Sequence, residues 1–191
     1  MESYLENNYT IIPCSIKFDT SLNKKSIKFP NKWSSVKTTD DSRTVFDSYH
    51  SYLSLAILTG TVNNITVIDV DKPDAWNKLN IDYPSEGVRV ATKNGFHLYF
   101  AYEPRLKTRS NIIEGIDVRN NGGNAILPPS FYDIKGERYE YTFIDDSIET
   151  AIEKLKNLPK ISEPLLKILN ETFEKPKVIK IELPICVKIR K

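Results

Sequence analysis

Two aspartates separated by one residue end a run of β-branched residues in segment 67–71, which reads Val-Ile-Asp-Val-Asp. Side chains alternate faces along a strand, so Asp69 and Asp71 would share one face while the apolar residues between and before them point into the core. Two carboxylates about 7 Å apart on a strand repel one another unless a divalent cation lies between them. Oxygen ligands of this kind suit Mg²⁺ or Mn²⁺. The alternative is that Asp71 caps the helix expected after Pro73.

Two further segments alternate polar and apolar residues in the same way. His97 shares a strand face with Tyr99 in segment 96–100, and Asp117 shares one with Arg119. Together these segments put three acids, a histidine and an arginine on what would be a single sheet face. Two-metal nucleotidyl transfer requires such a set, because acids hold the metal ions and cationic side chains hold the triphosphate. Taken singly, His97 is as well explained as a hydrogen-bonded structural residue, and Asp117 with Arg119 as a surface ion pair that contributes little.

The elements that must position these residues follow from periodicity and from turn residues. Segment 19–37 is interpreted as a polar, Lys-rich connection, and Asp146 with Glu149 resembles a capping box for the clearest helix. Consecutive strands in the middle of the chain favour an α+β domain over a doubly wound sheet. Strands are expected at 9–16, 65–70, 88–91, 96–102, 112–118, 125–127 and 139–143, with helices at 41–52, 73–79, 146–158 and 163–173.

Composition limits the class of protein. The 191 residues suit one compact domain, and the net charge of +2 means that any phosphate-binding surface must be local. Cys14 and Cys186 lie far apart and outside any metal-ligand spacing, which predicts ordinary thiols in a reducing compartment. The start of the chain lacks the basic and apolar regions of a signal peptide, and no stretch approaches the roughly 18 apolar residues of a membrane span. We therefore expect a soluble, intracellular protein with no membrane partner.

Taken in order, three motifs make the chain similar to a known family. They are the apolar run ending in Asp69-x-Asp71, the segment 92–100 with its Gly-containing turn before His97, and the segment 116–119. The third is followed by Gly122-Gly123 and by Pro128-Pro129-Ser130. Over roughly residues 9–143 the chain resembles the bifunctional primase-polymerase domain of the archaeo-eukaryotic primase superfamily, which is found in plasmids, phages and large DNA viruses.

The resemblance implies a fold and a division of the chain. The expected fold is α+β and primase-like, with an RRM-like antiparallel or mixed sheet, flanking helices and an N-terminal α/β unit. Residues 1–160 would form the catalytic domain, and 161–191 a C-terminal helix with a basic tail or linker. The Lys-rich stretch from Lys24 and Lys25 to Trp33 resembles the family's entry segment. Its expected role is structural, with Trp33 buried, and a contact of either lysine with the template is the alternative.

The resemblance also implies roles for residues. Asp69, Asp71 and Asp117 would bind Mg²⁺ or Mn²⁺, and His97 would contact the triphosphate. Some members have Ser two positions before the motif His, where this chain has Gly95. Arg119, Lys93 and Ser130 complete the expected nucleotide-binding set, with Lys93 compensating for the absent hydroxyl.

The expected function is that of a DNA primase-polymerase, which joins nucleoside triphosphates on a single-stranded DNA template during plasmid or viral replication. A helicase domain or subunit is an expected partner. One rival is a non-catalytic nucleic-acid-binding module, against which the intact acids argue. The other is a metal-dependent nuclease, although cationic His97 and Arg119 suit a triphosphate better.

Overall fold

The computed structural model describes residues 1–49, 52, 54–84 and 86–173. It is an α+β structure, as the sequence predicts, and every strand pair among these residues is antiparallel. The helices are α1 (Glu2–Glu6), α2 (Thr39–Ser48), α3 (Pro73–Asn77), α4 (Ile148–Leu155) and α5 (Glu163–Phe173), with a 3-10 turn at Trp33–Ser35. The strands are β1 (Ile11–Asp19), β2 (Lys24–Lys28), β3 (Ser54–Leu58), β4 (Ile65–Val70), β5 (Arg89–Ala91), β6 (Phe96–Ala101), β7 (Arg109–Ile113), β8 (Ile116–Arg119), β9 (Asn124–Leu127), β10 (Phe131–Ile134), β11 (Glu137–Glu140) and β12 (Thr142–Phe143).

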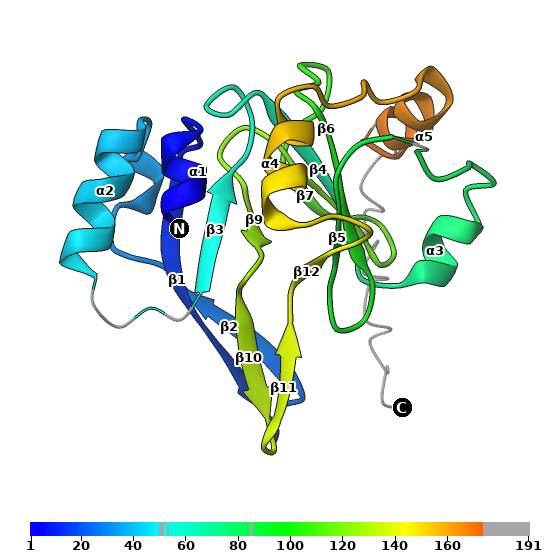
Figure 1. Ribbon diagram of the computed structural model, residues 1–191. Helices are drawn as coiled ribbons and strands as arrows, with labels where there is room; N and C mark the ends of the chain where they lie inside the picture. The colour runs from blue at the N-terminus through cyan, green and yellow to red at the C-terminus, as the bar shows by residue number, and fades with distance from the viewer. Residues whose placement is uncertain (50–51, 53, 85, 174–191) are drawn as a thin grey trace, which may run out of the picture.

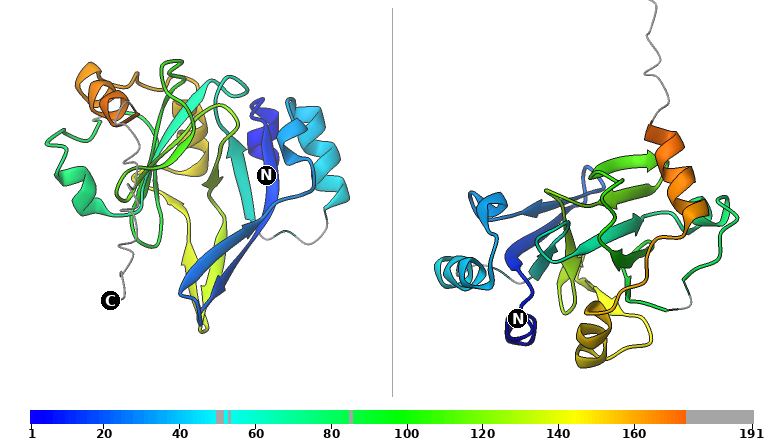
Figure 2. Two further views of the ribbon diagram at one scale, coloured as in Figure 1. Left: turned by 180° about the vertical axis from the view of Figure 1, so that it is seen from behind. Right: turned by 90° about the horizontal axis from the view of Figure 1, so that it is seen from above.

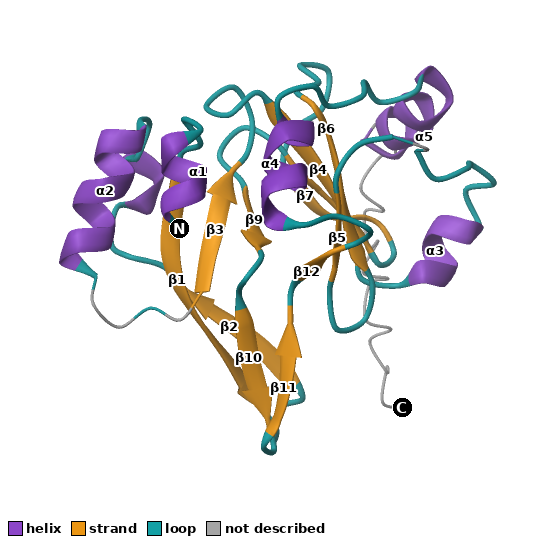
Figure 3. Ribbon diagram, viewed as in Figure 1, coloured by secondary structure: helices purple, strands orange, loops and turns teal. Residues whose placement is uncertain are grey.

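Two sheets make up the body of the described chain. The first has the strand order β2-β1-β3-β9, and the second has the order β12-β5-β6-β4-β8-β7. Figure 1 shows α1 and α2 beside the first sheet and α3 and α5 at the far side of the second, and both views in Figure 2 agree. The hairpins β1–β2 and β10–β11 extend together from the body, as the orange arrows of Figure 3 show.

The six-stranded sheet uses its two faces differently. On its central strand β4, Ile68 and Val70 join one buried cluster with residues of α3 and α5. Ile65 and Val67 point the other way and join a second cluster, which contains residues of the first sheet and of α4. Asp69 and Asp71 continue the Ile65–Val67 face because side chains alternate along a strand. The acids therefore lie on the face of this sheet that meets the first sheet.

Several expected elements are wrong in detail. Segment 19–37 is not only a connection, because it contains β2, which pairs with β1 through a tight turn. The single strand expected at 112–118 is the hairpin β7–β8, which turns at Gly115 with a φ of 81°. The single strand expected at 139–143 is divided between β11 and β12, which lie in different sheets.

Residues just before two of the helices cap them, and the cap expected for α4 needs correction. Thr38 caps α2 by accepting from the backbone N–H of Asp41, whose carboxylate accepts in return from the N–H of Thr38. Ser147 caps α4 in place of Asp146. The carboxylate of Asp146 instead pairs with Lys154 at 2.6 Å, so it is not available to the helix N-terminus.

The C-terminal part of the described chain is docked on the second sheet. Leu165, Leu166 and Leu169 of α5 are buried in the cluster formed with Ile68 and Leu98. The expected basic tail and Cys186 lie outside the described residues, and Cys14 is a buried free thiol. None of the helices in the described ranges has the length and apolar character needed to cross a membrane.

Candidate metal centre and nucleotide site

Asp69 occupies the middle of the six-stranded sheet. Its strand, β4, pairs with β6 on one side and with β8 on the other, and Asp69 is directly opposite His97 and Asp117. Directly opposed residues of an antiparallel pair have Cβ atoms about 5 Å apart. Strand pairing alone therefore brings together a histidine and two acids from segments that are far apart in the sequence.

The three carboxylates converge. One oxygen of each of Asp69, Asp71 and Asp117 lies within 4.8 Å of the others. Asp71 follows the last residue of β4 and is exposed. It does not cap α3, whose N-cap residue is Lys72 and makes no side-chain capping hydrogen bond. Carboxylate oxygens at these separations are a donor set that fits a hard divalent cation such as Mg²⁺ or Mn²⁺.

Asp117 is held in place by its neighbours. Its Oδ1 accepts a hydrogen bond from the backbone N–H of Asn111, and its Oδ2 pairs with Arg119. Asn111 adopts a positive φ of 52° where the β7–β8 register shifts, and such an irregularity re-aims the backbone. Arg119 also lies 3.9 Å from Asp69 and donates to the hydroxyl of Ser110 at 3.2 Å. The guanidinium thus partly neutralises the acidic cluster.

The cluster is electrostatically strained. Burial raises the pKa of Asp69 to about 6, and the charge of Asp117 acts in the same direction, while Arg119 and Lys25 oppose both. Burial, followed by the charge of Asp69, also raises the pKa of Asp71. Asp69 and Asp71 are therefore harder to ionise than in water, and a bound cation would relieve that cost.

His97 is buried and lies beneath the acids, with its Nε2 3.5 Å from Asp69. Burial lowers the pKa of His97 to about 3, and the charges of Lys25 and Arg119 add to this effect. The imidazole is therefore neutral at neutral pH, and the expectation of a cationic His97 is wrong. A neutral imidazole can still donate one hydrogen bond to a phosphate oxygen.

A cavity of about 410 Å³ opens beside the acids, between the two sheets. One residue of the lining, Lys25, was not among the nucleotide-binding residues expected from the sequence. Strand β2 brings it to the cavity from the first sheet. Trp33 is half-buried and lines the same cavity, so its expected full burial is wrong. The lining includes Lys25, Ile27, Phe29, Trp33, Asp69, Asp71, His97, Arg119, Gly122, Gly123 and Tyr141.

The structure places the last two candidates elsewhere. The ammonium of Lys93 lies over the rings of Phe18 and Tyr139, at 5.1 Å and 4.8 Å from their centroids. It lines an adjoining hollow together with Lys25 and Asp71. The buried hydroxyl of Ser130 accepts from the backbone N–H of Leu55 and donates to its carbonyl, and it does not line the cavity beside the acids. Both hydrogen bonds of Ser130 tie the cis-proline segment to β3.

The structure explains why a glycine stands at position 95, which the sequence alone did not. A Cβ built at this position would lie 1.8 Å from the carbonyl oxygen of Val70, next to Asp71. A serine here would therefore collide with the backbone that carries Asp71. The turn instead uses Thr92, whose hydroxyl accepts from the N–H of Gly95 at 3.1 Å.

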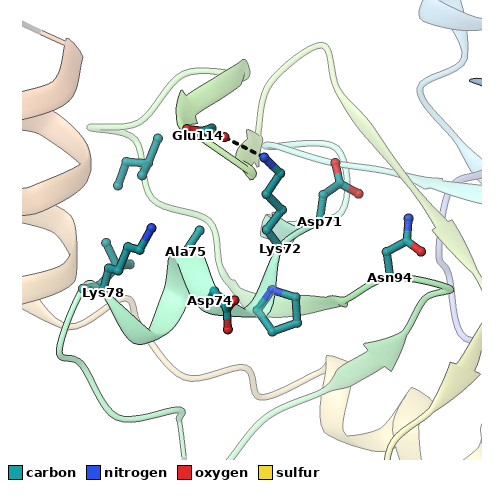
Figure 4. A pocket seen from close by; sticks show the side chains of 10 residues that line it. Asp71, Lys72, Asp74, Ala75, Lys78, Asn94 and Glu114 are labelled. Carbon is teal, nitrogen blue, oxygen red and sulfur yellow. Dashed lines mark hydrogen bonds and ion pairs between the residues drawn. The ribbon is translucent and has the colours of Figure 1, made fainter.

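A second hollow lies on the other side of Asp71, with a volume of about 720 Å³. Figure 4 shows its lining, in which the ammonium of Lys72 is turned toward Glu114, 2.6 Å away. Lys72 is therefore paired with Glu114 and does not neutralise Asp71. Neither Asp69 nor Asp117 lines this hollow, whereas Asp69 and Asp71 both line the 410 Å³ cavity, together with Arg119, the partner of Asp117.

The antiparallel α+β fold and the three converging carboxylates define a candidate divalent-metal site beside a cavity that carries cationic groups. The model of the Prim-Pol family, described as bifunctional DNA primase/polymerase, N-terminal, matches residues 1–161. Because this match covers most of the 191 residues, the chain belongs to that family. The family implies a DNA primase or polymerase role and nucleotide and DNA substrates. A search of curated proteins gives no match to the chain.

Proposed function

We propose that this protein catalyses template-directed nucleotidyl transfer, synthesising primers or extending DNA during replication. The observation that carries the proposal is the convergence of the carboxylates of Asp69, Asp71 and Asp117, two of which line a cavity with Arg119 and His97. The 3′-oxygen of a primer or initiating nucleotide forms a bond to the α-phosphorus of the incoming nucleotide. The bond from that phosphorus to the β-phosphate oxygen breaks, pyrophosphate leaves, and the hydroxyl proton passes to solvent.

Each residue has a distinct part in the proposal. The three aspartates hold Mg²⁺ or Mn²⁺, which when bound lowers the pKa of the attacking hydroxyl and stabilises the leaving pyrophosphate. Arg119 orients Asp117 and offers its remaining N–H groups to the triphosphate. His97, as a neutral imidazole, donates a hydrogen bond to the triphosphate. Lys93 lines the adjoining hollow and contacts phosphate from there, while Ser130 keeps its bonds to Leu55 and supports the strand.

We further propose that the six-stranded sheet is the RRM-like sheet of the primase fold and that the first sheet with α1 and α2 is the N-terminal α/β unit. Residues 1–160 then form the catalytic domain, with α5 docked on it. The template is gripped through its backbone with little sequence reading. The expected helicase partner rests on the resemblance alone and stays a prediction.

The test is a primer-synthesis assay with labelled nucleotides on single-stranded and on primed DNA, with Mg²⁺ and Mn²⁺ compared. We expect metal-dependent incorporation that is lost in Asp71→Asn and kept in Asp74→Asn, a matched change of an aspartate three residues further on. An end-labelled strand in the same reactions separates the rivals. Shortening of that strand without incorporation would indicate a nuclease, and binding without either reaction would indicate a non-catalytic module.

A further inference from the structure

Lys25 enters the site from the opposite sheet. It lies on β2, which pairs with β1 in the hairpin that projects from the first sheet. Side chains alternate along a strand, and Lys25, like Ile27, lines the cavity beside the acids. All three lysines of β2 are exposed, and Lys24 and Lys28 lie on the face of the strand turned away from the cavity. Of the three, Lys25 is the lysine that lines the cavity.

The Lys25 ammonium is fixed by neutral groups. Its Nζ donates to the hydroxyl of Tyr141 at 2.9 Å and lies 5.6 Å and 5.9 Å from the ring centroids of Tyr141 and Tyr132. Within the described ranges it has no carboxylate within 4.0 Å, although Asp69 and Asp71 line the same cavity. Tyr141 is itself buried, and its ring lies 5.9 Å from that of His97. The ammonium therefore stands in a defined place, where its charge acts on Asp69 and Asp71 from a distance and no carboxylate contacts it.

The other basic groups of this cavity are already engaged. Arg119 is paired with Asp117, and His97 lies beneath Asp69, buried and 3.5 Å from its carboxylate. Among the described residues that line the cavity, Lys25 is the basic side chain without an acidic partner. An ammonium in this position suits a phosphate group, to which lysine binds as a compact point charge.

We propose that Lys25 is a further catalytic residue, which contacts the phosphates of the incoming nucleoside triphosphate from the side opposite the acids, with Tyr141 as its positioning residue. The inference rests on the proposed function, because it takes the nucleotide to lie in the cavity beside Asp69, Asp71 and Asp117. It means that both sheets contribute to the site: the six-stranded sheet supplies the acids with Arg119, and the first sheet supplies an ammonium that has no acidic partner in contact.

The experiment compares Lys25→Met with Lys24→Met in the full chain. Methionine keeps an apolar stem over the tyrosine rings and removes the charge, and Lys24 is a matched control from the same strand. Binding of inorganic tripolyphosphate with Mn²⁺ is measured by calorimetry, beside the KM for nucleotide and the affinity for single-stranded DNA. We expect Lys25→Met to weaken tripolyphosphate binding and to raise the nucleotide KM, each by roughly ten- to a hundredfold. For the Lys24→Met control, the tripolyphosphate affinity and the nucleotide KM should stay within about twofold of those of the unaltered protein, as expected of an exposed charge.

Two results would overturn the inference. One is tripolyphosphate binding by Lys25→Met within about twofold of the control, in variants whose urea unfolding curves match. The other is a loss of DNA affinity with normal tripolyphosphate binding, which would assign Lys25 to the template. Failure of the proposed function is seen separately, because the unaltered protein would then incorporate no nucleotide while the tripolyphosphate measurement still reports on Lys25.

The role of Tyr141 is tested by a double-mutant cycle. Tyr141→Phe keeps the ring and removes the acceptor of the Lys25 hydrogen bond. If Tyr141 acts through Lys25, this change should raise the nucleotide KM in the unaltered protein and add little in the Lys25→Met background. Equal effects in both backgrounds would show that Tyr141 acts independently and would overturn its positioning role.

Discussion

Replacing Asp69 by asparagine should stabilise the metal-free protein at neutral pH while abolishing synthesis. Asp69 is central in the sheet, its side chain is 18% exposed, and it shares its surroundings with Asp71 and Asp117. Its pKa is raised to about 6, with burial as the main cause. At pH 7.5 the folded protein therefore carries an ionised group that its surroundings disfavour. Asparagine has nearly the same shape and removes that charge.

The size of the effect follows from the two pKa values. The ordinary pKa of an aspartate is 3.8, and that of Asp69 in the folded protein is about 6. Each pKa unit corresponds to 1.36 kcal/mol, so ionising Asp69 costs about 3 kcal/mol more in the folded protein than in water. The pKa of about 6 already includes the attraction of Arg119, which lies 3.9 Å from Asp69. The figure is an upper bound because the amide of asparagine is itself a polar group that is costly to bury. We therefore expect the free energy of unfolding of Asp69→Asn to exceed that of the unaltered protein by about 1–3 kcal/mol at pH 7.5.

The pH dependence has a definite sign. Between the unfolded pKa of 3.8 and the folded pKa of about 6, the native state keeps a proton on Asp69 that the unfolded state releases. Stability therefore falls as the pH rises through this window, and the contribution of Asp69 is fully unfavourable above it. The advantage of Asp69→Asn should accordingly shrink to nothing below about pH 4.

Urea unfolding followed by circular dichroism, with a chelator present, measures the difference at pH 4 and pH 7.5. Asp133→Asn is the control, since Asp133 is exposed on β10 and its pair with Arg138 is a surface contact at 3.7 Å. Adding Mn²⁺ should raise the stability of the unaltered protein by mass action and that of Asp69→Asn much less. If Asp69→Asn is the less stable protein at pH 7.5 in chelator, the carboxylate is stabilising and the reasoning is refuted.

Three further changes test the surroundings of the acids. Gly95→Ala would put a Cβ 1.8 Å from the carbonyl oxygen of Val70, so we expect a loss of about 1–3 kcal/mol in urea unfolding and weaker Mn²⁺ binding in calorimetry as the turn moves Asp71. Ser130→Ala removes two buried hydrogen bonds to Leu55, and it should cost about 1–3 kcal/mol of stability with an unchanged nucleotide KM in the folded protein; a raised KM would return Ser130 to the nucleotide site. His97→Gln, which retains a neutral donor, should keep a lower nucleotide KM than His97→Ala, and equal KM values would indicate a packing role for His97.

Most of the candidate site could be predicted from strand periodicity, because the alternation of side chains shows which residues share a strand face without knowledge of the tertiary structure. Asp69, Asp71 and Asp117 could be assigned to one face from the apolar residues between them. The antiparallel pairing of β4 with β8 then placed Asp117 directly opposite Asp69. The family resemblance supplied the roles that periodicity cannot give.

The position of Lys25 in the site could not be predicted from strand periodicity. Within β2 only Ile27 is apolar, so the strand has no alternation strong enough to distinguish it from a polar loop, and its stability comes from pairing with β1. The tyrosine that fixes the Lys25 ammonium lies 116 residues further along the chain. The β7–β8 hairpin was hidden for a related reason: its apolar residues run on across Gly115, whose positive φ turns the chain.

The charge state of His97 depends on burial, which alternation does not reveal. The polar face of β6 was expected to look toward a ligand, yet His97 and Tyr99 are both buried where the two sheets meet. A histidine in that position loses its proton because its surroundings disfavour the charge. Sequence reasoning found the residue and assigned it the wrong charge.

The same strand that bears the strained acids also anchors the fold. Val67, Ile68 and Val70 of β4 are fully buried, two of them against α3 and α5 and one against the opposite sheet. Burial of such side chains contributes about 1.5–3 kcal/mol each, and the three together exceed the cost of about 3 kcal/mol for one ionised Asp69. The acids can therefore be held close together without a bound cation. A cation that binds them removes the cost, so adding Mn²⁺ should raise the folding stability of the unaltered protein, and this metal-induced gain should shrink when any one of the three aspartates is replaced.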